Sequence, residues 1–229
     1  FANESSIVQG NINVADAATF TNTDELTSTV ALVNEGTIAN TGELTIKDGT
    51  NKGMINGTGT LNVNGAVDNT DTNAVISQDT INVAETGSIT TNADSTKFKA
   101  DNGVHNAGII TFNGGTNAND IDSYNTTYGS VEIAGNVTNA GNINNDIKLT
   151  SGTFFTSTGV LTTQDRTLTT AGGNLNTQNN GTEAYAFSKI IMNEDMLWAM
   201  DMSLAGDGSA DTINAANVEN TTDKKIKLD

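Results

Sequence analysis

Apolar residues in this chain alternate with polar residues in short runs that return at a fixed interval. The stretch from Gly36 to Ile46 repeats as Gly53 to Val63, with every apolar and glycine position shifted by the same 17 residues (53 − 36). The paired positions are Gly36/Gly53, Ile38/Ile55, Gly42/Gly59, Leu44/Leu61 and Ile46/Val63. Alternation with a period of two predicts half-buried strands. A repeat of this length predicts a solenoid, in which each coil buries its apolar face only by stacking on its neighbours.

Looser copies of the same pattern extend over most of the chain. Asn106–Phe112 matches Asn40–Ile46, and Asn139–Ile143 matches Asn34–Ile38. Asparagine tolerates the left-handed backbone of tight corners, and stacked amides hydrogen-bond along a ladder. We therefore expect four repeat asparagines to have this structural role: Asn34, Asn40, Asn106 and Asn139. The expected fold is an all-β parallel β-helix whose core residues include Ile38, Leu44, Ile46, Ile55, Leu61 and Val63.

Two segments depart from the repeat. Residues Asn113–Gly129 are polar and contain two tyrosines, which predicts a loop that protrudes from the stack, with Tyr124 and Tyr128 as binding anchors. From residue 183 to 229 the composition changes, because four of the five methionines and the only tryptophan lie there. Strands are favoured over a helix for this part, since one parity is shared by Met192, Met196, Trp198, Met200, Met202 and Leu204. We expect one β-helix over 1–229, ending in these distinct coils.

Composition and charge reduce the range of possible functions and partners. The chain has no proline, which fits a stack in which nearly every strand is central, and no cysteine, which removes disulfides and thiolate sites. The net charge is −17, with 27 acidic residues against 10 basic ones. That charge disfavours nucleic acid as a partner. No apolar run approaches 18 residues, so this segment is not expected to insert into a membrane.

The coils of the form Asn-x-Gly-x-Ile, together with the segment Met200–Ala215, resemble the passenger domains of bacterial autotransporters, and most closely those of the AIDA-like adhesins. The resemblance implies a right-handed parallel β-helix on the bacterial cell surface, anchored through an outer-membrane barrel that is absent from this chain. It also implies attachment to a host cell-surface protein or glycan, or self-association. Because Phe1 begins in the middle of the pattern, we expect the chain to be a fragment of a longer passenger.

Residues suited to catalysis are scarce. The single histidine, His105, lies in a predicted turn, and the single arginine, Arg166, is expected to form a local surface pair with Asp165. No catalytic residue is therefore expected, and a non-enzymatic adhesin, self-associating module or spacer is the first hypothesis. A β-helical polysaccharide-cleaving enzyme or phage tailspike-like protein is the alternative, and carboxylates that converge beside Arg166 would favour it. A structural filament or surface-layer element is the third.

Two acidic clusters are candidates for weak calcium binding. Asp207 and Asp211 lie in a segment that resembles one imperfect copy of the Gly-x-Gly-x-Asp calcium repeats. Asp120 and Asp122, with Asn117 and Asn119, offer closely spaced oxygen ligands but lack the glycine and the final glutamate of an EF-hand loop. Polar turns are the favoured interpretation of both clusters, so no metal or other cofactor is expected as a resident group.

Overall fold

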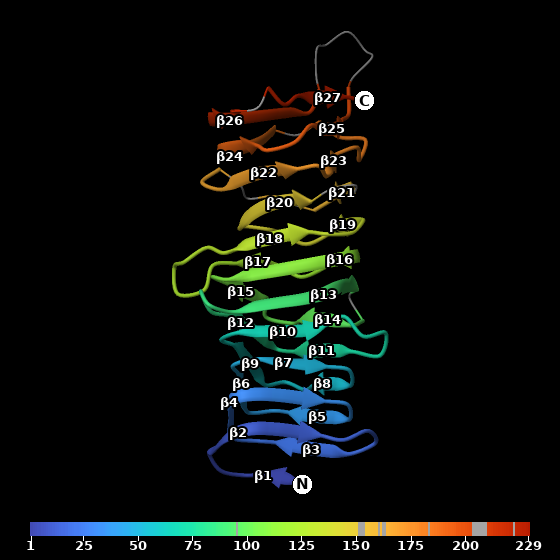
Figure 1. The fold of residues 1–229 in the computed structure, drawn as a ribbon. Coiled ribbons are helices and arrows are strands. Elements are labelled where there is room, and N and C mark those ends of the chain that lie inside the picture. Colours follow the sequence, from blue (N-terminus) through green and yellow to red (C-terminus); the bar gives the residue numbers. More distant parts are fainter. Residues whose placement is uncertain are drawn as a thin grey trace.

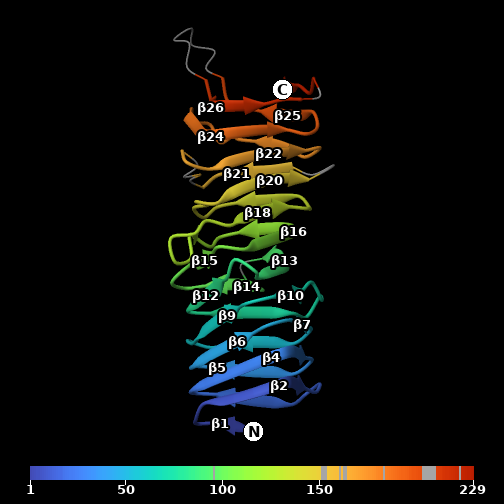
Figure 2. The same cartoon turned by 60° about the vertical axis from the view of Figure 1, so that its left-hand side comes forward.

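The computed structural model is an all-β right-handed solenoid of parallel strands with about nine turns. The structure describes residues 1–94, 96–150, 154–159, 161, 164–182, 184–202, 210–221 and 223–229. Figure 1 shows the coils stacked from the N terminus at the bottom to the C terminus at the top, with strands such as β13 and β16 running from left to right at the front. Figure 2 shows the same rod turned by 60°.

Each coil has three strand positions, which we call faces 1, 2 and 3. Face 1 consists of the first halves of β2 (Ile7–Val14) and β4 (Glu25–Asn34), then β6 (Glu43–Ile46), β9 (Thr60–Val63), β12 (Thr80–Val83), β15 (Val104–Asn106) and β17 (Ile121–Asp122). Face 2 continues from the second halves of β2 and β4 through β7 (Gly49–Asn51), β10 (Ala66–Asn69), β13 (Ser88–Asp94), β16 (Ile109–Asn117), β18 (Ser130–Ile133), β20 (Asp146–Thr150), β22 (Thr167–Ala171), β24 (Ala184–Met192) and β26 (Thr212–Glu219).

Face 3 has a lower and an upper part. The lower part consists of β1 (Ala2–Asn3), β3 (Thr19–Asn22), β5 (Thr37–Asn40), β8 (Met54–Asn56), β11 (Val75–Gln78) and β14 (Phe98–Ala100). The upper part begins where the end of β16 pairs with β19 (Val137–Asn139), and continues with β21 (Phe154–Ser157), β23 (Asn174–Asn176), β25 (Met196–Ala199) and β27 (Ile226–Leu228).

The 17-residue repeat is confirmed as one coil. Leu44 lies opposite Leu61 in the register of β6 and β9, and Ile38 lies opposite Ile55 in β5 and β8. The six predicted core residues have side chains with no exposed surface: Ile38, Leu44, Ile46, Ile55, Leu61 and Val63. They form part of one continuous apolar core that runs along the rod.

The repeated glycines have a steric role. A Cβ atom on Gly53 would lie 2.0 Å from the carbonyl oxygen of Gly36, and one on Gly59 would lie 2.3 Å from that of Gly42. Successive coils approach too closely at these corners for any side chain. The glycines of the repeat therefore mark where one coil rests on the next.

Buried amides form ladders beside the apolar core, as predicted, but the left-handed backbone also expected of these asparagines is wrong, because none of Asn34, Asn40, Asn106 and Asn139 has a positive φ. Asn34 Nδ2 donates to Asn51 Oδ1 at 2.7 Å, and Asn51 Nδ2 donates to Asn69 Oδ1 at 2.7 Å. Asn106 and Asn139 are likewise fully buried, and each donates to the next polar side chain in its own stack. Their amide nitrogens also donate to backbone carbonyls, as Asn34 Nδ2 does to Met54 O and Asn51 Nδ2 does to Val75 O, which lowers the cost of burying them, whereas Asn34 Oδ1 has no hydrogen-bond partner among the described residues.

The C-terminal part forms strands, as predicted, and within it Met192, Met196 and Trp198 are buried. The prediction that Met202 faces the same side of a strand as these residues is wrong, because its side chain is 63% exposed. The cause is that the chain has left the strand, and Met202 instead forms an antiparallel bridge with Ala210. Leu204 lies outside the described residues. In the part of the chain that the structure describes, no helix has the length and apolar character needed to cross a membrane.

Candidate functional site

The chain leaves the regular coil between β17 and β18, at the corner where face 1 turns into face 2 (Figure 1). Tyr124 and Thr127 exchange two backbone hydrogen bonds, of 2.9 and 3.0 Å, so the segment is a tight hairpin. Its two central residues, Asn125 and Thr126, have φ angles of 50° and 67°. Positive φ at both positions is the geometry of a type I′ turn. It is unfavourable for a β-branched threonine, so the surrounding structure must hold the hairpin in place.

The base of the hairpin is held from the C-terminal side by a chain of contacts across successive coils. Asp122 Oδ1 accepts from Ser123 N at 2.7 Å and from Asn144 Nδ2 at 2.9 Å. Asn144 Oδ1 in turn accepts from Arg166 Nε at 3.2 Å. The guanidinium carbon of Arg166 lies 3.2 Å from the centre of the Tyr128 ring, a cation–π contact. The single arginine of the chain therefore braces the hairpin.

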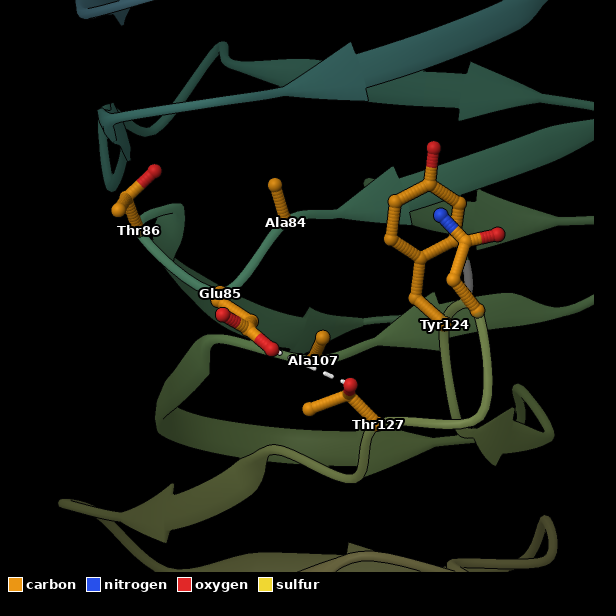
Figure 3. A pocket seen from close by; sticks show the side chains of 7 residues that line it. Ala84, Glu85, Thr86, Ala107, Tyr124 and Thr127 are labelled. Atoms are coloured by element: carbon orange, nitrogen blue, oxygen red, sulfur yellow. Dashed lines mark hydrogen bonds between the residues drawn. The ribbon is translucent and has the colours of Figure 1, made fainter.

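The tip of the hairpin is held by the turn that contains Glu85, which lies nearer the N terminus of the rod. Thr127 Oγ1 donates to Glu85 Oε1 at 3.2 Å, across 42 residues of sequence. Between the hairpin and the turn that contains Glu85 lies a hollow of about 320 Å³. It is lined by Ala84, Glu85, Thr86, Ala107, Tyr124, Asn125 and Thr127. Figure 3 shows the Tyr124 ring on the hairpin side and Glu85 and Thr86 on the opposite turn.

The hollow combines an aromatic ring with hydrogen-bonding groups. Tyr124 supplies an apolar ring face with a polar hydroxyl, while Glu85 and the Thr86 oxygen supply acceptors, since the Thr86 hydroxyl already donates to Asn64 O at 2.8 Å. A small number of polar groups beside an apolar surface, in a volume near the lower end of the usual 300–1,000 Å³ range, is typical of sites for small ligands or for one unit of a polymer.

The predicted loop Asn113–Gly129 is wrong in its first part. Residues 113–117 belong to β16, and Asn117 and Asn119 are buried in the amide stack of face 3. Of the two predicted anchors, Tyr124 lines the hollow, whereas Tyr128 contacts Arg166 beside it. The exposed element is thus the shorter hairpin Ser123–Gly129.

The acidic cluster around Asp120 does not converge. The Asn117 and Asn119 side chains point into the rod, while Asp120 and Asp122 lie on its surface and accept hydrogen bonds from Asn142 N and Asn144 Nδ2. Alternation along a strand places these neighbours on opposite sides of the wall. Within the described ranges, no group of three or more His, Asp or Glu side chains could hold a metal ion.

The second acidic pair has a different setting. Asp207 lies outside the described residues. Asp211 is buried, and its Oδ2 accepts from Thr177 Oγ1 at 2.6 Å and from Asp201 N at 2.9 Å. Thr177 Oγ1 also accepts from Trp198 Nε1 at 3.0 Å. Asp211 thus takes part in a buried hydrogen-bond network that links the last coils.

His105 lies on β15 directly opposite Asp122 in the register of β15 and β17.

Two surface groups near the C terminus, Asp195 and Lys224, have shifted pKa values. The pKa of Asp195 is lowered by a hydrogen bond from Lys227 and by another from the Lys225 backbone, and that of Lys224 is raised by its hydrogen bond to Glu194. These are surface pairs between the last coils, and such pairs contribute little to stability.

Sequence reasoning missed Glu85, Thr86 and Ala107, which complete the hollow. What could have indicated them is their position in the coil: Ala84 and Ala107 directly follow Val83 and Asn106, which pair in register at the same corner.

Comparison of the chain with protein-family models, with curated proteins and with solved structures found no match.

Proposed function

We propose that this chain is a non-enzymatic, surface-displayed β-helical binding module that acts as an adhesin, and that the Ser123–Gly129 hairpin is its binding element. The observation that carries the proposal is the bracing of this hairpin from both sides. Glu85 holds its tip and Arg166 holds its base, at 3.2 Å in each case. A segment held in an unfavourable backbone conformation beside an aromatic hollow is pre-organised to bind, because little ordering cost remains to be met.

The rod supports the same function. Its coils stack along one axis, so the corner between faces 1 and 2 recurs from coil to coil along the rod (Figure 2). If the chain is a passenger of the kind its sequence resembles, the rod stands at the bacterial cell surface, anchored through an outer-membrane barrel. A lateral element halfway along the rod would then be presented to a host cell-surface protein or glycan, or to a second copy of the chain.

The test is adhesion of bacteria that display the chain, with Tyr124 changed to serine. We expect the Tyr124→Ser variant to lose adhesion by about tenfold or more, because truncating a tyrosine that is a binding hot spot costs about 2 kcal/mol or more, and every ~1.4 kcal/mol is tenfold in affinity. The matched control is Phe154→Ser, which removes an aromatic side chain that is 38% exposed on face 3. It should leave adhesion unchanged.

Surface display of each variant is measured with an antibody against a terminal tag. Equal adhesion by wild type and Tyr124→Ser, at equal display, would remove the hairpin as the binding element. Turnover of a polysaccharide by the purified chain would show that the molecule is an enzyme.

A further inference from the structure

A second hollow lies on the same corner of the rod, toward the N terminus. It has a volume of about 300 Å³ and is lined by Thr27, Ser28, Thr29, Thr45, Lys47 and Asn64. Four hydroxyl side chains and one amide surround a single lysine there. Its lining contains no carboxylate.

Strand register places the two hollows on one line. Ser28 pairs with Ile46, Ile46 with Val63, and Val63 with Val83, so the residues that follow them share the corner in successive coils. In order along the rod these corner residues are Thr29, Lys47, Asn64, Ala84, Ala107 and Tyr124. Thr86 Oγ1 of the upper hollow donates to Asn64 O of the lower hollow at 2.8 Å. At about 4.8 Å per coil, the five steps from Thr29 to Tyr124 span roughly 24 Å.

The charge of Lys47 is not neutralised by a neighbour. Other lysines form ion pairs, such as Lys52 with Glu35 at 3.1 Å and Lys148 with Glu132 at 2.8 Å. Lys47 has no carboxylate oxygen within 4.0 Å among the described side chains. The adjacent Asp48 instead accepts from Ala66 N at 2.8 Å.

We infer that this corner, from Lys47 to Tyr124, binds one linear glycan that lies along the rod and carries a carboxylate or sulfate group. The inference rests on the proposed function, because it names the ligand class of the same hairpin. One sugar ring lies against Tyr124, and the acidic substituent of another lies beside Lys47 and the hydroxyls of Thr27 and Thr45, whereas Thr29 Oγ1 donates to Gln9 O at 3.1 Å.

Two observations favour a glycan over a protein surface. Together the two hollows are lined by one aromatic residue and six residues with aliphatic hydroxyls: Thr27, Ser28, Thr29, Thr45, Thr86 and Thr127. Four of these hydroxyls, those of Ser28, Thr29, Thr86 and Thr127, donate within the protein and offer their oxygens as acceptors for sugar hydroxyls. Protein interfaces are instead centred on several aromatic, methionine or arginine side chains. The net charge of −17 repels an acidic polymer over most of the surface, so a lysine without a carboxylate partner among the described side chains is a favourable place for its acidic group.

The test uses calorimetry on the purified chain with a linear hexauronate and with the same hexasaccharide after reduction of its carboxyl groups. Wild type should bind the acidic form about three- to fivefold more tightly, which is the size of an exposed charge pair. Lys47→Gln should abolish that preference and leave the affinity for the neutral form unchanged. Tyr124→Ser should weaken binding of both forms about tenfold. Lys225→Gln, a lysine changed far from this corner, is the matched control and should behave as wild type.

A preference for the acidic form that persists in Lys47→Gln would overturn the inference. So would the absence of binding to both sugars by a chain that still supports Tyr124-dependent adhesion, and the proposed function would then stand with a protein partner or a second copy of the chain. If sugars bind equally to wild type and Tyr124→Ser, and adhesion is also equal, the hairpin proposal itself falls.

Discussion

Replacing Leu61 by alanine is expected to lower the free energy of unfolding by about 2–5 kcal/mol. Leu61 is fully buried, and it lies in register between Leu44 and Ile81 in the coils below and above. Each coil of a solenoid is stabilised mainly by its neighbours. A cavity at Leu61 therefore weakens two interfaces between coils.

Urea unfolding followed by circular dichroism measures this change. Val8→Ala is the matched control, because Val8 is 62% exposed and its truncation leaves no cavity. It should cost less than about 0.5 kcal/mol. A Leu61→Ala chain as stable as the Val8→Ala chain would show that these coils do not stack through their leucines.

Replacing Asn51 by leucine is expected to lower the free energy of unfolding by about 3 kcal/mol or more. Asn51 accepts from Asn34 Nδ2 at 2.7 Å and donates to Asn69 Oδ1 at 2.7 Å and to Val75 O at 3.0 Å. Leucine is similar in size but removes all three hydrogen bonds, and each buried group left without a partner costs about 1–3 kcal/mol.

Urea unfolding measures this change, and Asn82→Leu is the matched control. Asn82 also donates to an asparagine, Asn62 Oδ1 at 2.8 Å, but its side chain is partly exposed, so water can replace the lost partner. Near-neutral behaviour is expected there. If both leucine variants were equally stable, the amide ladder would be a consequence of the fold and not a source of its stability.

The repeat could be predicted residue by residue because its signal is local. Two alternating runs with fixed glycines, Gly36–Ile46 and Gly53–Val63, determine which side chains point inward and which positions tolerate no Cβ. The asparagine ladders follow from the same repeat. Each of these features depends on one coil meeting an almost identical coil.

The loop prediction for Asn113–Gly129 is wrong where polar amide side chains are buried. Asn117 and Asn119 are among the least exposed residues of the segment predicted as a loop, because the ladder satisfies their hydrogen bonds inside the rod. In this fold a polar run alone does not distinguish a surface loop from a strand, since Ser123–Gly129 of the same run is an exposed hairpin. Alternation marks the strand, and the amide stack replaces the apolar side chains that would otherwise reveal it.

The hollow could not be predicted because it depends on distant partners. The Glu85–Thr127 hydrogen bond joins residues 42 positions apart, and the Arg166–Tyr128 contact joins separate coils. Neither follows from a local pattern. Only the register of consecutive strands shows that Lys47, Ala84 and Tyr124 share one corner.

A single-site cross-linking experiment tests most directly whether this corner carries the function. The chain has no cysteine, so one introduced cysteine carries one photo-reactive label. The labelled positions are Asn125→Cys, at the exposed hairpin tip, and Met54→Cys, which replaces a side chain that is 39% exposed on face 3. On target cells the account predicts cross-linking to the bound partner from position 125 and none from position 54. Cross-linking from position 54 without any from position 125 would contradict it.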